Sequence, residues 1–426
     1  MASLRSFKSL MAVFSLLTSL IGISGLLAQE ETVSRTSLSK VADANNRFAI
    51  DLYRNLNAHE TGKNIFVSPY SISTALAMTY EGSRNNTQKQ MAAVLHLNLS
   101  DAERQAGYSA LLTQTKAAPG KHYKLEIANA LWGQKGYHLE PAFLKTTSKF
   151  YGGSLYPVDF AHNTEGARVE INTWVEDHTA KKIRDLIPQG AIDAQTPLVL
   201  TNAIYFKGDW AFQFKAAATK DAPFNVSTAI KVQVPMMRQI EHFRFVREDG
   251  LTAIELPYAG NDLSMIAILP NGDVEKLGES LSLDQIQKMR GDMRSQVVDV
   301  SLPRFKLENS YGLASTLTQM GMPDAFSEKD ADFSGMTGHP DLYISHVIHK
   351  AMVDVNEEGS EAAAATAVIM APKSVRLEMP ETFRADRPFI FMIIHNPTGS
   401  ILFMGRVSNP HVEVAAKTGD TKTGEK

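Results

Sequence analysis

The residues of this sequence that could do acid–base or metal chemistry are its histidines, and two of them lie close together. His346 and His349 are three positions apart in the run Tyr343–Val355, whose apolar pattern favours a strand. Side chains three apart on a strand point to opposite faces, so these two cannot share a metal ion. We therefore expect His349 to be a buried, hydrogen-bonded histidine, which could act as a pH-sensitive latch, rather than a catalytic base.

No motif indicates another kind of catalysis. The chain has no cysteine, and it contains no GxSxG, HExxH, GxxxxGK[ST] or GxGxxG run. The net charge of -3 argues against a nucleic-acid partner. Lys181, Lys182 and Arg184 are better explained as one solvated helix end than as a polyanion site. We expect no enzyme activity, no catalytic residue, no metal and no cofactor; the enzymatic alternative is a hydrolase whose dyad is dispersed over the fold.

The most unusual stretch is Glu357–Pro388, where an acidic start leads into six consecutive small residues, 362–367. Alanine favours a helix, but there is no apolar stripe to dock one, and Pro372 and Pro380 interrupt any regular element. As a strand, the stretch has an uncharged face whose first half is very small, with Glu361 on the other face. The residues on the uncharged face are Ser360, Ala362, Ala364, Thr366, Val368 and Met370. Such a segment could enter between two existing strands without a steric clash.

Other elements must position this stretch. Residues Thr36–Leu56 have helical periodicity, and Asn64–Ile72 (NIFVSPYSI) is typical of a short buried strand that turns into a helix capped by serine or proline. A helix is expected from Ile171 to Ile187, ending at Pro188. Strands are expected at Leu198–Phe206 and repeatedly from Val234 onward. Helices mostly precede strands, which favours an α+β fold, and no composition break divides the chain.

Several of these runs together resemble the serpin family, in its order and spacing. They are the hinge run Glu357–Thr366, FRADRPF (Phe383–Phe389), HNPTGSILFMGRV (His395–Val407), Asn64–Ile72 and the INTWVEDHTAKKIRDLI helix. The resemblance covers nearly all of residues 36–410. It implies a single α+β domain with a large mixed central sheet, further sheets, about eight or nine helices and an exposed reactive loop at about 357–387.

The resemblance also implies roles for individual residues. The region beneath the opening of the central sheet would include Ser68, Ser71, Asn202, Trp210 and His349; for Trp210 the alternative is a plain core aromatic. Glu357 would pair with Arg304 at the base of the loop. The hinge would comprise Glu357, Gly359, Ser360, Glu361, Ala362, Ala363, Ala364, Ala365 and Thr366.

By the same resemblance, the expected function is suicide-substrate inhibition of serine proteases. A protease would attack a bait bond in the loop and form an acyl-enzyme. The hinge would then insert into the central sheet and carry the trapped protease with it. The partner is therefore a target serine protease in a covalent complex, and the protein itself is a monomer that can form loop–sheet polymers. The alternative is a non-inhibitory, serpin-like carrier of a hydrophobic ligand.

Two basic bonds compete as the bait. Counting along the loop from Glu357 indicates Lys373-Ser374, and Arg376-Leu377, three residues on, is the second basic candidate. Counting back from the FRADRPF run instead favours a bond near Leu377-Glu378. Either basic residue would fit a protease pocket that holds a carboxylate, so a trypsin-like target is expected. The alternative for Lys373 is a solubilising loop charge.

The two ends of the chain lie outside this domain. Arg5 and Lys8 precede an uncharged run that ends near Ala28, which predicts a secretory signal at residues 1–28 and a secreted, extracellular or, in a bacterium, periplasmic protein. An uncleaved N-terminal anchor is the alternative. Residues 411–426 are polar and charged and are expected to form a disordered tail.

Overall fold

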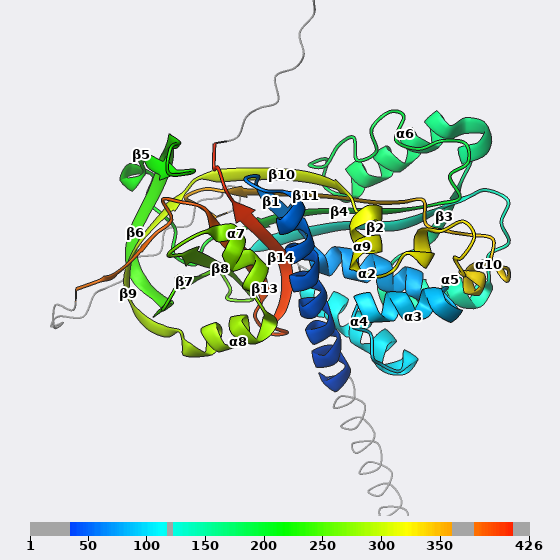
Figure 1. Cartoon of the computed structure of the whole chain (residues 1–426), viewed down its shortest axis with the longest axis horizontal. Helices are drawn as coiled ribbons and strands as arrows, with labels where there is room; N and C mark the ends of the chain where they lie inside the picture. Colours follow the sequence, from blue (N-terminus) through cyan, green and yellow to red (C-terminus); the bar gives the residue numbers. More distant parts are fainter. Residues whose placement is uncertain (1–34, 117–121, 360–378, 412–426) are drawn as a thin grey trace, which may run out of the picture.

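The computed structural model describes residues 35–116, 122–359 and 379–411 (Figure 1). The helices are residues 35–59, α2 (Pro69–Tyr80), α3 (Asn85–Val94), α4 (Asp101–Thr115), α5 (Pro141–Tyr151), α6 (Phe160–His178), α7 (Val274–Ser280), α8 (Leu283–Asp292), α9 (Ala314–Met320) and α10 (Ser334–Thr337). The strands are β1 (Ile65–Val67), β2 (Tyr123–Gln134), β3 (Leu155–Val158), β4 (Leu198–Gly208), β5 (Lys220–Asn225), β6 (Lys231–Glu248), β7 (Leu251–Pro257), β8 (Leu263–Pro270), β9 (Arg294–Pro303), β10 (Phe305–Gly312), β11 (His346–Val355), β12 (Glu381–Arg384), β13 (Phe389–His395) and β14 (Ser400–Val407).

A five-stranded mixed sheet runs through the middle of the molecule in the order β10-β11-β4-β2-β3. Its central pair, β11 and β4, is parallel, while β10 and β2 pair antiparallel on either side of it. In Figure 1 α6 lies on one face of this sheet, and α2 lies on the other. Two hydrophobic cores result, a small one beneath α6 and the main one on the α2 side.

Short-range sequence signals explain why α2 begins where it does. Ser68 is the N-cap, and its hydroxyl accepts a hydrogen bond from the Ser71 amide, while Pro69 occupies the first helical position, where no amide donor is needed. Every residue of α2 is buried. A helix so enclosed gives a rigid floor beneath the central sheet.

The second sheet has nine strands, and β13 and β14, the last two described strands, lie in its interior. Its order is β1-β14-β13-β8-β7-β6-β9-β12, with β5 paired to β6. Every residue of β13 and β14 is buried. Strand β14 lies between β13 and β1, so Gly405 is opposite Phe66, more than 300 positions earlier in the chain.

The α+β prediction, with one domain, a mixed central sheet and a further sheet, is confirmed; the described residues form ten helices, where about eight or nine were expected. The predicted extent of one helix was wrong. The helix expected to run to Ile187 ends at His178. Ala180 takes the left-handed conformation (φ 50°), and the Lys181 amide bonds back to the Glu176 carbonyl, which closes a Schellman turn.

The apolar periodicity that suggested a longer helix has a different cause. Beyond the turn, Ile183, Leu186 and Ile187 are buried in the small core, so this segment packs on the sheet without being helical. Lys181 and Lys182 are therefore not part of a helix end; the Lys182 ammonium lies 5.5 Å from the centre of the Tyr205 ring. Among the described residues, none of the helices is both long and apolar enough to cross a membrane.

Candidate functional site

The parallel strands β11 and β4 part at one end of the central sheet. Their register runs from His346 opposite Val199 to Met352 opposite Tyr205, and the pairing stops there although both strands continue for three residues. After β11 the chain turns back. The Asn356 amide donates to the Gly359 carbonyl (2.8 Å), and Gly359 forms an antiparallel bridge with Asp209, which directly follows β4. We call residues 356–359 the gate turn.

Only glycine fits the last position of the gate turn. Gly359 has φ +141°, and a Cβ built on it would lie 2.1 Å from the Gly208 carbonyl oxygen and 2.6 Å from the Asp209 Cα. Both obstacles are backbone atoms, so they could not move aside cheaply. The turn therefore rests tightly on the end of β4.

An ion pair fixes the gate turn on the side of β10. Arg304 Nε lies 2.7 Å and 2.8 Å from the two carboxylate oxygens of Glu357, and the Thr219 hydroxyl also donates to this carboxylate. Burial disfavours the charged carboxylate, but the hydrogen bonds from Arg304 and Thr219 outweigh that effect, so the pKa of Glu357 lies below its ordinary value. The Phe214 amide holds the Glu357 carbonyl (2.9 Å).

We expect Glu357→Lys to polymerise faster than the parent protein on warming. Lysine would place an ammonium group against the Arg304 guanidinium, and the gate turn would lose its anchor. Light scattering at a series of temperatures measures the rate. The matched control is the double variant Arg304→Glu with Glu357→Lys, which restores an opposite-charge pair and should recover most of the difference. Equal rates for the single variant and the parent would show that the ion pair does not keep the gate closed.

Trp210 holds the other side of the gate turn. Its backbone amide donates to the Glu358 carbonyl (2.9 Å), and its indole Nε1 donates to the Asn356 carbonyl (3.0 Å). The indole is buried and stacks on Tyr258, with ring centres 4.5 Å apart. Trp210 is thus both a core aromatic and a direct clamp on the backbone of the turn.

Further along the same strand pair, polar groups form a buried cluster under the sheet. His349 on β11 lies opposite Asn202 on β4, and the histidine Nδ1 contacts the Asn202 side-chain oxygen. The Ser68 amide donates to His349 Nε2 (3.1 Å), and Asn202 Nδ2 donates to the Ser71 hydroxyl (2.6 Å). The structure thus brings four residues named from the sequence into one network, which joins the two strands to α2.

The sequence reasoning missed Asn129, which completes this network. Its side-chain oxygen accepts hydrogen bonds from the Ser71 hydroxyl (2.8 Å) and from Asn202 Nδ2 (2.6 Å). A signal was present, because Asn129 interrupts the apolar strand LEIANALW, and a polar residue there must find a buried partner.

His349 is fully buried and neutral, and this has a measurable consequence. Burial lowers the pKa of His349 to about 3. Its Nε2 accepts a hydrogen bond from the Ser68 amide, so a proton on Nε2 would bring two N–H donors against each other. The unfolded chain takes up this proton near pH 6.5, whereas the native state does not until about pH 3. Native stability should therefore fall as the pH drops from 6.5 towards 3, by about 1.4 kcal/mol per pH unit from this residue.

Urea unfolding midpoints at several values between pH 7 and pH 4.5 check this expectation. His349→Gln removes the titrating group, so its midpoint should depend less steeply on pH than that of the parent. Parallel curves for the two proteins would mean that His349 takes up its proton in the folded state as readily as in the unfolded one.

The remaining residues named from the sequence lie outside the described part of the chain. These are the hinge residues Ser360, Glu361, Ala362, Ala363, Ala364, Ala365 and Thr366, and the bait candidates Lys373, Ser374, Arg376 and Leu377. Within the described residues, no group of three or more His, Asp or Glu side chains could hold a metal ion.

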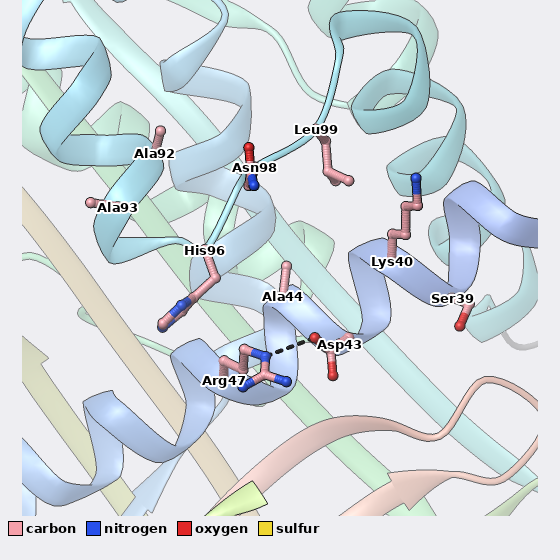
Figure 2. A pocket seen from close by; sticks show the side chains of 10 residues that line it. All are labelled: Ser39, Lys40, Asp43, Ala44, Arg47, Ala92, Ala93, His96, Asn98 and Leu99. Carbon is pink, nitrogen blue, oxygen red and sulfur yellow. Dashed lines mark hydrogen bonds and ion pairs between the residues drawn. The ribbon is translucent and has the colours of Figure 1, made fainter.

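A cavity of about 790 Å³ lies between the first helix and α3 (Figure 2). The basic side chains that line it each have an acidic partner, because Arg47 bonds to Asp43, Lys40 to Glu103 and His96 to Asp51. A smaller cavity, of about 210 Å³, lies where β11 and β4 part, between Tyr205, Met352 and Lys182.

The parallel pair of β11 and β4 thus separates at one end, and the gate turn is seated between the separated ends. A family model described as "Serpin (serine protease inhibitor)" matches residues 43–410. The chain belongs to the serpin family.

Named relatives agree with this assignment. Leukocyte elastase inhibitor from Bos taurus is 43% identical over 383 residues, which is 88% of this chain and 100% of that protein. The inhibitor from Sus scrofa is 44% identical over 384 residues, again 88% and 100%. Among solved structures, uncleaved ovalbumin superimposes with a TM-score of 0.78 at 32% identity, covering 87% of this chain and 100% of that one. Human thyroxine-binding globulin in complex with its hormone gives 0.79 at 33% identity, with 88% and 100% covered.

The same relatives overturn the prediction of secretion. The leukocyte elastase inhibitors, matched over their whole length, are intracellular serpins that lack a signal peptide. The prediction that the protein is extracellular or periplasmic was therefore wrong, and the relatives give no support to a secretory signal at residues 1–28. It rested only on the composition of a segment that lies outside the described residues.

Proposed function

We propose that this protein inhibits serine proteases as a suicide substrate, by inserting its hinge between β11 and β4. The observation that carries the proposal is the register of the gate turn. The turn pairs Asn356 with Gly359, and Gly359 bridges to Asp209. If these two registers were extended residue by residue along β11 and β4, Ala364 would come opposite both Ala351 and Ile204, which are partners of each other. The hinge can therefore pair with both strands at once, without a slip.

This register also gives each hinge residue a suitable neighbour. Glu361 would lie opposite Lys207, where a cross-strand pair of opposite charges is favourable. Ala364 would face the main core beside Ile204, which is fully buried. Thr366 would enter between His349 and Asn202 and replace their contact. The small, uncharged side chains of the hinge thus suit the space that the strands enclose.

Insertion is favoured energetically. It would replace one parallel strand pair by two antiparallel pairs, which are slightly more stable per residue. Ten to twenty new backbone hydrogen bonds at about 0.5–1.5 kcal/mol each give a gain on the order of 10–20 kcal/mol. That matches the whole stability of an ordinary domain, so the uninserted state is a kinetic trap that cleavage of the loop releases.

We assign the bait bond to Lys373-Ser374, with Arg376-Leu377 as the alternative, and hence a trypsin-like target. The relatives are named for inhibition of leukocyte elastase, and a target of that kind would move the bait to another loop residue. About 14 inserted residues at ~3.3 Å each would carry the acylated protease roughly 45 Å along the sheet. The protein would perform no turnover of its own.

The test is to mix the protein with trypsin, separate the products on SDS gels and locate the cut by mass spectrometry. A covalent complex cut after Lys373 supports both mechanism and bait. A complex cut after Arg376 keeps the mechanism and moves the bait. Clean cleavage by trypsin, elastase and chymotrypsin without any complex would overturn the proposal and favour the carrier alternative. Thyroxine-binding globulin, to which this chain is similar, is the comparison for that alternative.

A further inference from the structure

A buried group of charged and polar side chains joins α2 to α4 and α5, which lie close together on one side of the central sheet (Figure 1). Glu81, at the end of α2, accepts hydrogen bonds from Arg104 Nε (2.9 Å) and Gln105 Nε2 (3.1 Å) of α4, and from the Tyr151 hydroxyl of α5. The Arg104 side chain is 2% exposed and that of Glu81 8%. The Arg104 guanidinium also lies 4.6 Å from the centre of the Tyr80 ring. We call Glu81, Arg104, Gln105 and Tyr151 the Glu81 cluster.

The position of Glu81 makes the members of the cluster depend on one another. Glu81 is the C-cap of α2, where the helix dipole disfavours a negative charge, and burial disfavours that charge further. Hydrogen bonds from Arg104 and Tyr151 compensate both effects. Burial and the Glu81 carboxylate raise the pKa of Tyr151, so its hydroxyl remains a proton donor. These charge-assisted bonds are directional, and the helices cannot slide past one another without losing them.

The cluster lies where helices lead into strands that would move during insertion. Helix α5 precedes β3, and only Gly152, Gly153 and Ser154 connect them. Gly153 lies against α2, since a Cβ built on it would be 2.4 Å from the Met78 sulfur. A strand that enters between β11 and β4 would push β4, β2 and β3 sideways by about 4.8 Å. With so short a connection, a shift of β3 would be transmitted to Tyr151, the last residue of α5.

Helix α2, in contrast, is tied to the part of the molecule that would not move with β3. The Ser68 hydroxyl donates to the Leu402 carbonyl of β14 (2.7 Å), and the Ser68 amide donates to His349 of β11 (3.1 Å). The bonds from Ser71 to β2 and β4 cross the boundary between the two parts at one end of α2. The Glu81 cluster crosses it at the other end, so opening of the sheet must strain or break the cluster.

We propose that the Glu81 cluster is a brake on the opening of the central sheet: it holds α4 and α5 on α2 and so slows the movement of β2 and β3 that admits a further strand. This inference rests on the proposed function, because that function requires the sheet to open. The brake lies away from the gate turn and shares no residue with it. By raising the barrier to opening, it would help to keep the uninserted state long-lived until the loop is cut.

The rate at which a free peptide enters the uncut protein measures how readily the sheet opens. The probe is a fluorescent peptide with the sequence of residues 360–373. The double variant Glu81→Leu with Arg104→Met exchanges the buried ion pair for apolar side chains, which should leave the urea unfolding midpoint equal to or above that of the parent. We expect the peptide to enter this variant about tenfold faster, because apolar contacts are not directional and no ion pair has to break. Tyr151→Phe, which removes one hydroxyl, should enter about threefold faster.

Lys40→Met is the matched control. Lys40 Nζ lies 2.6 Å from Glu103, so this pair also joins α4 to another helix, but its side chains are 46% and 33% exposed and it leads to the first helix rather than to α2. We expect peptide entry into Lys40→Met at the parent rate. Hydrogen exchange without peptide gives a second readout: the amides of α4 and α5 should exchange faster in the double variant than in Lys40→Met.

The other outcomes are distinct. Equal peptide entry into the parent, the double variant and Tyr151→Phe would overturn the brake and leave the inhibition mechanism intact. Entry accelerated just as much by Lys40→Met would also overturn it, because any loosening of α4 would then suffice. If the double variant is less stable than the parent, Tyr151→Phe alone decides. If the peptide enters none of the proteins, the central sheet does not accept a strand, and the proposed function fails together with the brake.

Discussion

Under the proposed mechanism, Ala364→Arg is expected to be cut and released by a protease that the parent protein traps in a covalent complex. If the hinge inserts in the proposed register, residue 364 would lie between Ala351 and Ile204, which are both fully buried on the side of the main core. An arginine there would bring an unpaired charge into that core, which costs several kcal/mol or more. Insertion would stall after the first few residues, and the acyl-enzyme would have time to hydrolyse.

SDS gels measure the fraction of protease held in covalent complex. We expect that fraction to fall from nearly all to almost none, with the loop still cut at the same bond. Ala364→Ser is the control, since a small hydroxyl side chain fits the same space and should leave the complex in place. An Ala364→Arg protein that forms the complex at the normal rate would sink the strand-insertion mechanism, and the register argument with it.

Cutting the reactive loop of the free protein is expected to raise its thermal midpoint by about 20 °C. The inserted strand contributes on the order of 10–20 kcal/mol, and a domain of this length has an unfolding entropy of about 0.8 kcal/mol per kelvin, which converts to roughly 13–25 °C. Such a gain from breaking a bond is the opposite of what a passive surface loop would give.

Thermal unfolding before and after limited proteolysis measures the shift, with mass spectrometry to establish a single cut between residues 368 and 378. The cut Ala364→Arg protein is the control and should gain far less. An unchanged midpoint in the cut parent protein would favour the carrier alternative. Together, the two experiments distinguish a variant loop whose side chain blocks insertion from a parent protein whose sheet does not accept the loop.

Much of the architecture could be predicted from the sequence because local and global signals agree. The buried strand at Ile65, the cap at Ser68 and the apolar strand after Leu198 each depend on neighbours in the sequence. The longer helix after Ile171 could not be bounded correctly, because Ala180 adopts a conformation that usually indicates glycine. The apolar residues Ile183, Leu186 and Ile187 continued the helical spacing, but they are buried because their non-helical segment packs on the sheet.

Some residues of the candidate site could be predicted from the sequence, and others could not. Arg304 and Glu357 were paired by resemblance, and the structure places them in contact. Asn129 is marked in the sequence as a polar residue in an apolar strand, but its partners, like those of Thr219, depend on which distant residues the topology brings beside it. The register of the gate turn is the least accessible to sequence reasoning. It depends on one backbone bridge, between Asp209 and Gly359, and spacing along the chain does not determine such a bridge.

The position of β14 has a consequence for synthesis of the protein in the cell. Among the described strands, β1 pairs with β14, and the buried guanidinium of Arg406 binds the carbonyls of Glu60 and Lys63. The N-terminal part of the core is therefore completed by residues that are synthesised near the end of translation. A ribosome adding about 5–20 residues per second needs some 17–70 seconds to make the intervening stretch. Throughout that time the edges that will receive β14 stay open, and a chaperone that shields them until translation ends would determine the yield of folded protein.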